Sequence, residues 1–166
     1  RYSVSVPETV RLLLGGPLPY GQQDMAYSVI YNVRLPRIIL AVIVGAGLAC
    51  SGAAFQGLFT NPLATPDTLG VASGASFGAV LAMMLEANLI VVQISALIFG
   101  LAACFITYNI SRIRGQSSIV MIVLGGMVVS AMFQAFVSLA KYVADPLDKL
   151  PSITYWLMGS MASSTY

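Results

Sequence analysis

The stretch Arg34–Gly70, RLPRIILAVIVGAGLACSGAAFQGLFTNPLATPDTLG, decides the fold of this chain. No residue from 38 to 66 is charged, and about 20 apolar residues are enough to cross a bilayer. Pro62 lacks an amide hydrogen and disfavours a helical conformation in the residue before it, so the helix must end at residues 60–61. Pro66 repeats this signal. The stretch therefore predicts a membrane-spanning helix that is followed by a short, proline-stiffened turn.

The composition of the whole chain agrees with a membrane protein. Of its 166 residues, 58% are hydrophobic and 8% are charged, which leaves too little polar surface to cover a water-soluble globule of this size. We therefore expect an all-α integral membrane protein that contacts lipid. The formal net charge of +2 includes no dense run of Lys and Arg, so we expect no nucleic-acid partner.

The residues that usually carry enzyme chemistry are sparse. The chain has no His, which removes the commonest metal ligand and the usual general base. Cys50 and Cys104 lie in separate apolar stretches outside any CxxC pattern, which favours small buried hydrophobes over a disulfide or a metal pair. No serine nucleophile elbow and no phosphate-binding glycine loop is visible. We expect no catalytic residue, metal site or cofactor, and therefore no enzyme.

Four uncharged stretches are each long enough for one membrane span: Ile38–Pro66, Thr68–Leu85, Ala87–Ser111 and Gly115–Ala140. We expect four transmembrane helices over about 36–60, 69–86, 88–111 and 117–142. The connection at 86–88 is tight, so the second and third spans should be antiparallel neighbours.

The polar ends of the chain are expected outside the hydrocarbon. Residues 1–33 should form an external interfacial segment with short helices near 10–14 and 23–31, ahead of a membrane domain over 34–166. A second external short helix is expected over about 152–160, with Ser152 as its cap, and Tyr155 and Trp156 as anchors at the membrane interface. The chain begins with Arg1 and no signal-peptide pattern follows, which is typical of a fragment or a processed product.

Small residues recur at intervals that suit close helix packing in lipid, namely Gly47, Ser51, Gly74 and Gly78. Small residues are also common in membrane helices in general. A functional role is not needed to explain them.

Four motifs give the chain a resemblance to a known family: RLPR at 34–37, SGxxxQ at 51–56, NPLAxPxxLG at 61–70 and SGAxxG at 73–78. Their order and spacing resemble those of the membrane permeases of ABC importers for iron-siderophores, haem and cobalamin. The resemblance covers about the amino-terminal half of the usual permease, without its first helix. It implies half of a ten-helix type II importer permease in a bacterial or archaeal cytoplasmic (inner) membrane.

The resemblance also implies partners. The full permease would be a homodimer with a second copy of itself, and would work with a substrate-binding protein and two cytoplasmic ATPase subunits. Those subunits would contact a part of the permease beyond this chain and would hydrolyse the ATP. The function implied is import of a metal chelate, and among the substrates of this family we expect an iron-siderophore. A small homo-oligomeric helical channel and a structural membrane subunit remain alternatives.

Charge alone favours the opposite orientation from the one that the family implies. Four spans place both termini on the same side of the membrane. Arg112 and Arg114 are the two basic residues on the opposite side. The side of the termini has six: Arg1, Arg11, Arg34, Arg37, Lys141 and Lys149. The positive-inside rule would put these termini in the cytoplasm. The resemblance implies that the RLPR end is external and the NPLA turn cytoplasmic. We follow the resemblance because the rule applies to complete topologies.

The resemblance implies three groups of site residues. Arg34 and Arg37 would dock acidic residues of the binding protein, although anchoring of a helix end is the simpler alternative. The cytoplasmic gate would consist of Asn61, Leu63, Ser117 and Ser118, and an ordinary proline-stiffened turn is the alternative there. The pathway would be lined by Ser130, Gln134 and Ser138, where hydrogen bonding between helices is an equally good account of Gln134.

Overall fold

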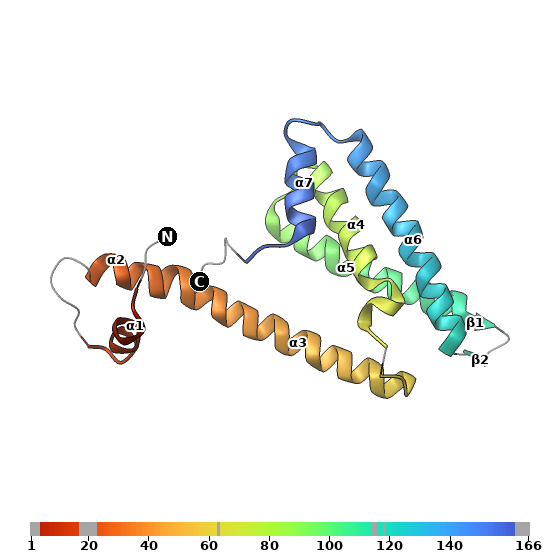
Figure 1. Ribbon diagram of the computed structural model, residues 1–166. Helices are drawn as coiled ribbons and strands as arrows, with labels where there is room; N and C mark the ends of the chain where they lie inside the picture. Colours follow the sequence, from red (N-terminus) through yellow and green to blue (C-terminus); the bar gives the residue numbers. More distant parts are fainter. Residues whose placement is uncertain (1–3, 17–22, 63, 114–115, 118, 162–166) are drawn as a thin grey trace. The chain divides into compact units, whose positions relative to one another are not determined.

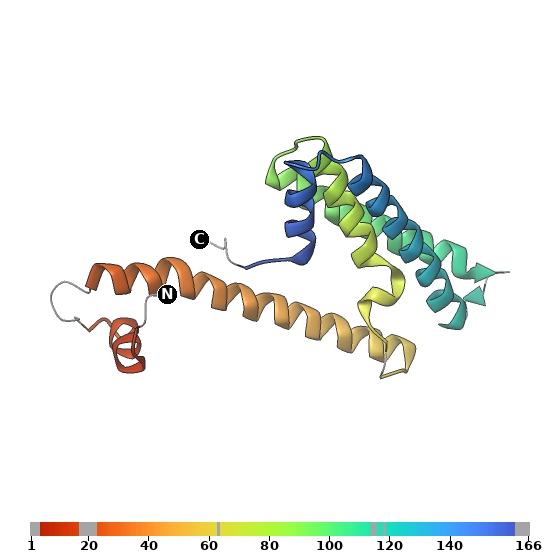
Figure 2. The same cartoon turned by 45° about the horizontal axis from the view of Figure 1, so that its top comes forward.

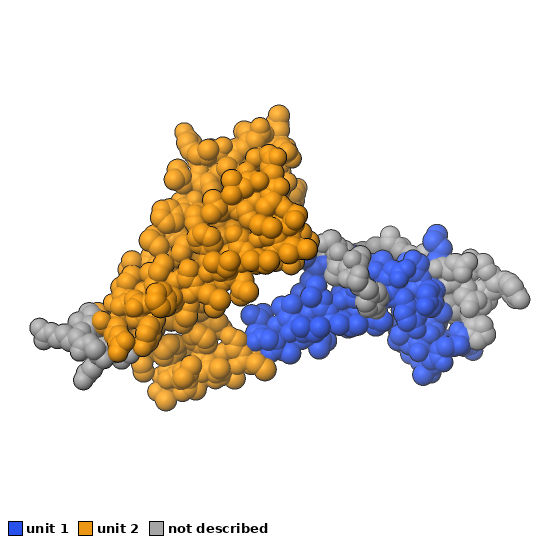
Figure 3. Space-filling view, turned by 180° about the vertical axis from the view of Figure 1, so that it is seen from behind, with its two compact units in different colours: residues 1–49, 160–166 blue, residues 50–159 orange. Residues whose placement is uncertain are grey.

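The computed structural model describes residues 4–16, 23–62, 64–113, 116–117 and 119–161 (Figure 1). Its elements are, in chain order, α1 Val6–Leu13, α2 Gln23–Ser28, the π-helical η1 Val29–Arg34, α3 Leu35–Phe59, the 3-10 helix η2 Pro66–Leu69, α4 Val71–Met84, α5 Leu89–Ser111, β1 Arg112–Ile113, β2 Gln116–Ser117, α6 Ile119–Val143 and α7 Lys149–Met158. The all-α prediction is confirmed, with one two-residue β pair as the exception among the described residues. The chain divides into two units, residues 1–49 with 160–166, and residues 50–159, which Figure 3 colours separately.

In the first unit, α1 begins earlier than the sequence predicts. The backbone N–H of Ser5 donates to the Glu8 carboxylate at 2.9 Å, which closes one half of a capping box and starts the helix at Val6 rather than at residue 10. Leu12 is buried against Ala26 and Ile30. These contacts attach α1 to the helical segment that leads into α3.

The sequence predicts a separate short helix near 23–31, but α2, η1 and α3 follow one another without a break. A proline inside a helix collides with the carbonyl four residues earlier, and Pro36 is the second residue of α3. The preceding turn is π-helical: the N–H of Leu35 donates to the carbonyl of Ile30, five residues back. This wider turn makes room for the proline ring, so the helix continues.

Three helices in the described part of the chain are long and apolar enough to cross a membrane: Met25–Phe59, α5 and α6. The sequence predicts a fourth, but α4 has 14 residues and is about 21 Å long, which is less than the roughly 30 Å of hydrocarbon. Residues 66–69 form η2 instead of helix, and Gly70, at φ 75°, separates η2 from α4. The turn therefore uses residues that the sequence assigns to the span.

In the second unit, α4 contacts α5, α6 and α7 (Figures 1 and 2). A Cβ at Gly74 would lie 2.6 Å from the Ala103 Cβ, and one at Gly78 would overlap the Ser95 carbonyl oxygen. Helices α4 and α5 therefore approach as closely as backbone allows. The ring of Phe77 packs edge-on against Phe99 of α5 at 5.2 Å and beside Phe133 of α6 at 5.7 Å.

The start of α7 corrects the sequence prediction. Ser152 is not its cap: α7 begins at Lys149, and the Ser152 hydroxyl donates to the carbonyl of Asp148 from within the first turn. Pro151 is tolerated there because first-turn amides have no helical partner to lose. Upstream, the Asp145 carboxylate accepts the Leu147 amide at 2.8 Å and begins the turn.

Helix α7 is attached to the far end of α4. Lys149 Nζ lies 2.8 Å from Glu86 Oε1 and donates to the Met84 carbonyl at 3.0 Å. Ile153 is fully buried in a cluster with Val80, and Trp156 packs against a second cluster that includes Val92. Trp156 is thus partly a core residue, whereas the sequence predicts an interfacial anchor; Tyr155 is 69% exposed.

Candidate functional site

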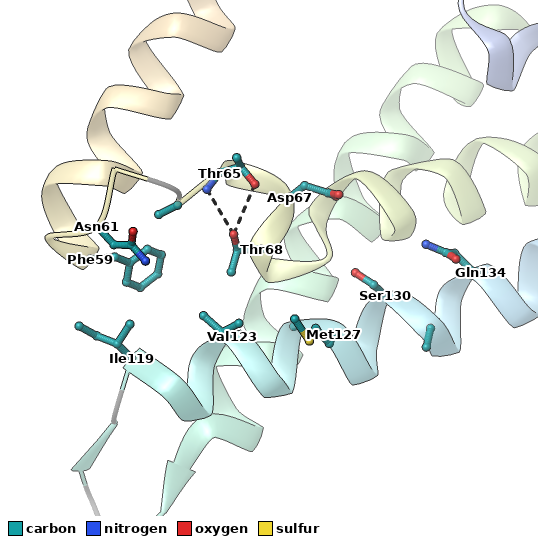
Figure 4. Close-up of a pocket in the computed structure, with 13 residues that line it drawn as sticks. Phe59, Asn61, Thr65, Asp67, Thr68, Ile119, Val123, Met127, Ser130 and Gln134 are labelled. Atoms are coloured by element: carbon teal, nitrogen blue, oxygen red, sulfur yellow. Dashed lines mark hydrogen bonds between the residues drawn. The ribbon is translucent and has the colours of Figure 1, made fainter.

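The turn between α3 and α4 has its own hydrogen bonds. Helix α3 ends at Phe59, and Thr60 adopts a positive φ of 47°. The Thr65 N–H donates to the Thr68 hydroxyl at 3.3 Å, and the two threonine hydroxyls lie 3.4 Å apart (Figure 4). Together with Pro66 at the start of η2, these bonds give the turn a defined shape rather than leaving it a loose link.

Both α5 and α6 hold the end of this turn. The buried hydroxyl of Thr107 on α5 donates to the Leu69 carbonyl at 2.9 Å. On α6, the Thr68 carbonyl lies so close to Gly126 that any Cβ at that position would overlap it. Gly70 lies beside Ser130 in a left-handed conformation that favours glycine.

These contacts place the turn deep within the length of α6. Gly126 and Ser130 are seven and eleven residues from the first residue of α6, or about 10 and 16 Å along its axis. Since α6 is one of the helices long and apolar enough to span a membrane, we infer that the turn enters the membrane-spanning layer instead of lying at its surface. Irregular backbone at such depth is tolerated where it is buried in protein or faces water.

A cavity of about 540 Å³ lies between the turn and α6. Figure 4 shows the turn residues Thr65 and Thr68 on one wall, across from Val123, Met127 and Ser130 on α6. In the described part of the chain, its polar lining residues are Asn61, Thr65, Asp67, Thr68, Ser130 and Gln134. Polar groups along a spanning helix are expensive in lipid and are found where a helix faces water or other protein.

The structure brings part of the predicted site together. Asn61, Ser130 and Gln134 all line this first cavity. Ser138 lines a second cavity of about 420 Å³, where Gln134 is again part of the wall. The Gln134 amide donates to the Ser73 hydroxyl at 3.4 Å, so it is also a contact between α6 and α4.

Other predicted residues lie elsewhere. Leu63 and Ser118 are outside the described residues, and only the backbone of Ser117 is described, in β2. Arg34 and Arg37 belong to the first unit, at the junction of η1 and α3, where Arg34 is exposed and Arg37 half-buried. The docking role of Arg34 and Arg37 stays a prediction, and so does the gating role of Leu63, Ser117 and Ser118.

Of the four small residues predicted to pack between helices, two contact a neighbouring helix in the structure. Gly74 and Gly78 lie against α5, whereas a Cβ at Gly47 would meet nothing within 4 Å. Ser51, in the same helix, is half-buried. A packing role for these last two therefore stays a prediction.

Three features of the site were missed by sequence reasoning. Asp67 is the one charged residue between 38 and 85, which is a signal that could have singled it out. Thr65 and Thr68 gave no signal apart from lying near prolines. Gly126 follows another glycine, and nothing in the sequence says which of the two meets the turn. Among the described residues, no three His, Cys, Asp or Glu side chains gather as metal ligands would.

Curated relatives match the chain over most of its length. The molybdate import system permease protein MolB of Haemophilus influenzae is 42% identical over 166 residues, which cover 100% of this chain and 49% of MolB. The cobalamin import system permease protein BtuC of Halobacterium salinarum is 37% identical over 151 residues, 90% of this chain and 40% of the relative. The hemin transport system permease protein HmuU of Yersinia pestis is 34% identical over 149 residues, which cover 86% of this chain and 44% of HmuU.

A solved structure agrees with these relatives. A metal-chelate type ABC transporter in an inward-facing conformation matches with a TM-score of 0.81 and 42% identity, over 100% of this chain and 48% of that one. The chain thus spans about half the length of the proteins it matches.

The predicted resemblance to importer permeases is confirmed, and with it the location in a prokaryotic cytoplasmic membrane. Four motifs in register, a fold shared along the whole chain and a family model that matches residues 1–166 lead to one assignment. The chain belongs to the FecCD transport family.

Proposed function

We propose that this chain is part of the permease subunit of an ABC importer that carries a metal chelate across the cytoplasmic membrane. The observation that carries the proposal is the turn between α3 and α4. This turn and α6, a helix long enough to cross the bilayer, form a cavity with a polar lining. A purely structural subunit needs no such cavity, since polar groups facing lipid are costly. Substrate would move along the α6 wall of this cavity.

The substrate class follows from chemistry shared by the relatives. MolB, BtuC and HmuU are named for molybdate, cobalamin and hemin, each of which contains a metal. We propose a metal-containing substrate, with an iron-siderophore complex as the first one to test, since siderophore permeases are among those that the four motifs resemble. The lining offers hydroxyl, amide and carboxylate groups, which can exchange hydrogen bonds with the polar periphery of such a complex.

The gate is proposed at the turn. Asn61 lines the first cavity, and Leu63, Ser117 and Ser118 are its proposed companions in the gate. Since Thr107 and Gly126 hold the turn against α5 and α6, a small shift of either helix would move the turn as a unit. Alternating access would then follow from helix movements that ATP binding and hydrolysis drive in separate ATPase subunits.

Partners are proposed on the same basis. Arg34 and Arg37 would receive carboxylates of a substrate-binding protein, because a guanidinium stays charged at any physiological pH and can form two parallel hydrogen bonds. A second permease copy would complete the path, and two cytoplasmic ATPase subunits would drive it.

Uptake measurements test the proposal. The native permease that contains this chain would be reconstituted in proteoliposomes with its ATPase and binding protein, and offered a ferric siderophore, hemin, cobalamin or molybdate. We expect ATP-dependent accumulation of one of these, and none with a hydrolysis-deficient ATPase. Ion flux without ATP would support the channel alternative instead. Neither flux nor binding-protein affinity would leave a structural subunit and overturn the proposal.

A further inference from the structure

Two cavities follow one another along α6, both within the second unit. The first extends along the helix from Ile119 to Gln134, and the second from Gln134 to Ser138. Between Ile119 and Ser138 the helix rises about 28 Å, which is close to the roughly 30 Å thickness of the hydrocarbon. The two cavities together therefore accompany α6 across nearly the whole membrane layer.

Of the residues that the structure describes, Asp67 and Gln134 are the two that line both cavities. Gln134 lies about 22 Å from the first residue of α6 and about 14 Å from its last, just past the middle of the helix. In Figure 4 the Asp67 carboxylate and the Gln134 amide extend toward one another, one from the turn and the other from α6. The cavities thus meet at a polar pair near mid-membrane.

Both members of the pair are held in place. Gln134 donates to Ser73 on α4, and Asp67 belongs to η2, whose end is fixed by Thr107 and by the contact with Gly126. A rigid support is what a selective constriction requires, since a side chain on a loose loop would move aside.

Asp67 also sets the charge of this junction. Among the described residues that line the two cavities, it is the only charged one. An ionisable residue at membrane depth faces water or a partner, and rings of such residues set ion preference in pores. Its carboxylate would raise the local concentration of cations and lower that of anions in both cavities.

We propose that Asp67 and Gln134 form a mid-membrane constriction that divides the path into two water-filled vestibules, and that Asp67 makes the constriction electronegative. The inference deepens the proposed function and rests on it, because it assigns both cavities to one path. It places a barrier at η2 and the middle of α6, in addition to the proposed gate at Asn61. Passage of a substrate would then need η2 and α6 to separate.

Thiol accessibility from each side of the membrane tests the barrier. In the native permease with Cys50 and Cys104 replaced by Ala, one variant carries Ser130→Cys in the first vestibule and another carries Ser138→Cys in the second. Each is reconstituted with its ATPase in sealed vesicles and treated from one face at a time with membrane-impermeant methanethiosulfonates. We expect the two cysteines to react from opposite faces, with at least a tenfold preference each.

Widening the constriction provides the second arm of this test. Adding Gln134→Ala and Asp67→Ala to either cysteine variant should let both thiols react from both faces. Reaction of both cysteines from the same face in the parent, at similar rates, would overturn the barrier. If the double alanine variant does not fold, Gln134→Ala alone serves, because Asp67 and the turn are then unchanged.

A charge measurement tests Asp67 separately. With Ser130→Cys as the target, the ratio of reaction rates for a cationic trimethylammonium-ethyl reagent and an anionic sulfonato-ethyl reagent reports the local potential. Asp67→Asn keeps the shape of the side chain and should lower this ratio about fivefold. Glu86→Gln removes an equal charge outside both cavities and should leave it unchanged. An unchanged ratio in Asp67→Asn would refute the electronegative constriction.

These outcomes are independent of the transport assay. Uptake by the parent together with cysteines that share one accessible face would refute the constriction and leave the proposed function intact. Opposite accessibility without uptake of any metal compound would support the constriction and refute the proposed function.

Discussion

Adjacent glycines in α6 meet different surroundings. A Cβ at Gly126 would overlap the Thr68 carbonyl, whereas one at Gly125 would lie 3.5 Å from the Thr107 carbonyl, an ordinary contact. Backbone cannot yield as the end of a flexible side chain can, so the two positions should respond very differently to one added methyl group. The tight packing of the turn thus depends on one of the two.

Gly126→Ala should destabilise the protein by about 1–3 kcal/mol, the usual cost of overpacking, because η2 must move away from α6. Gly125→Ala is the matched control and should leave stability unchanged or raise it by up to about 1 kcal/mol, the usual gain from replacing glycine inside a helix. Thermal unfolding of purified protein in detergent measures both. Equal unfolding temperatures for the two variants would show that the turn adapts without strain.

At the scale of elements, α7 is attached to α4 through Lys149 and through apolar contacts of Ile153 and Trp156. The hydrogen bond and positive charge of Lys149 hold the pKa of Glu86 below the usual value for this side chain. A carboxyl whose pKa is lowered by folding stabilises the fold above its unfolded pKa, about 4.3, and loses that contribution as pH falls through the folded value. Because Glu86 is exposed, the contribution is small.

Acid should therefore weaken the ionic part of the attachment of α7 to α4. Trp156 is the only tryptophan among these 166 residues, so the fluorescence of this chain reports the contact of α7 with α4. We expect a spectral shift in the parent as pH falls below about 4.3, the usual pKa of Glu, because Lys149 holds the pKa of Glu86 lower still. Glu86→Gln should lack the acid-dependent part of that shift, and the same titration curve for both proteins would contradict the assignment.

At the scale of the whole molecule, the two basic residues of the RLPR motif lie in the first unit, while the cavities belong to the second. The proposed docking surface and the proposed path are thus carried by different units of the chain. Docking should accordingly be separable from passage by mutation.

Reversing both charges, Arg34→Glu with Arg37→Glu, should weaken affinity for the binding protein at least tenfold, because each lost guanidinium–carboxylate pair is replaced by repulsion between like charges. Binding to nanodisc-embedded permease is the measurement, with expression level as the check on folding. Arg112→Glu, in the other unit, reverses a charge of the same sign outside the RLPR motif and should leave affinity unchanged. Unchanged affinity in the double variant would remove both arginines from the docking site.

The sequence by itself determined the membrane class, the helical fold and the family. Each rests on local information: long uncharged stretches cross a bilayer wherever they pack, and four motifs in register identify a family without any contact being known. The helix end before Pro62 could also be predicted from local sequence, because a proline disfavours helix only in the residues next to it.

Only the tertiary structure decided how deep the turn lies and what it meets. The sequence predicts a first span that begins near residue 36, yet a π-helical turn lets the helix continue through Pro36. The sequence also predicts Ser152 as a cap, yet Asp145 begins the turn earlier. Asp67 and Gln134 are far apart in the chain, and they share two cavities because Gly126 admits the Thr68 carbonyl and Thr107 binds the next one. Contacts between residues so distant in the sequence depend on which helix surfaces pack together, and local sequence patterns do not predict them.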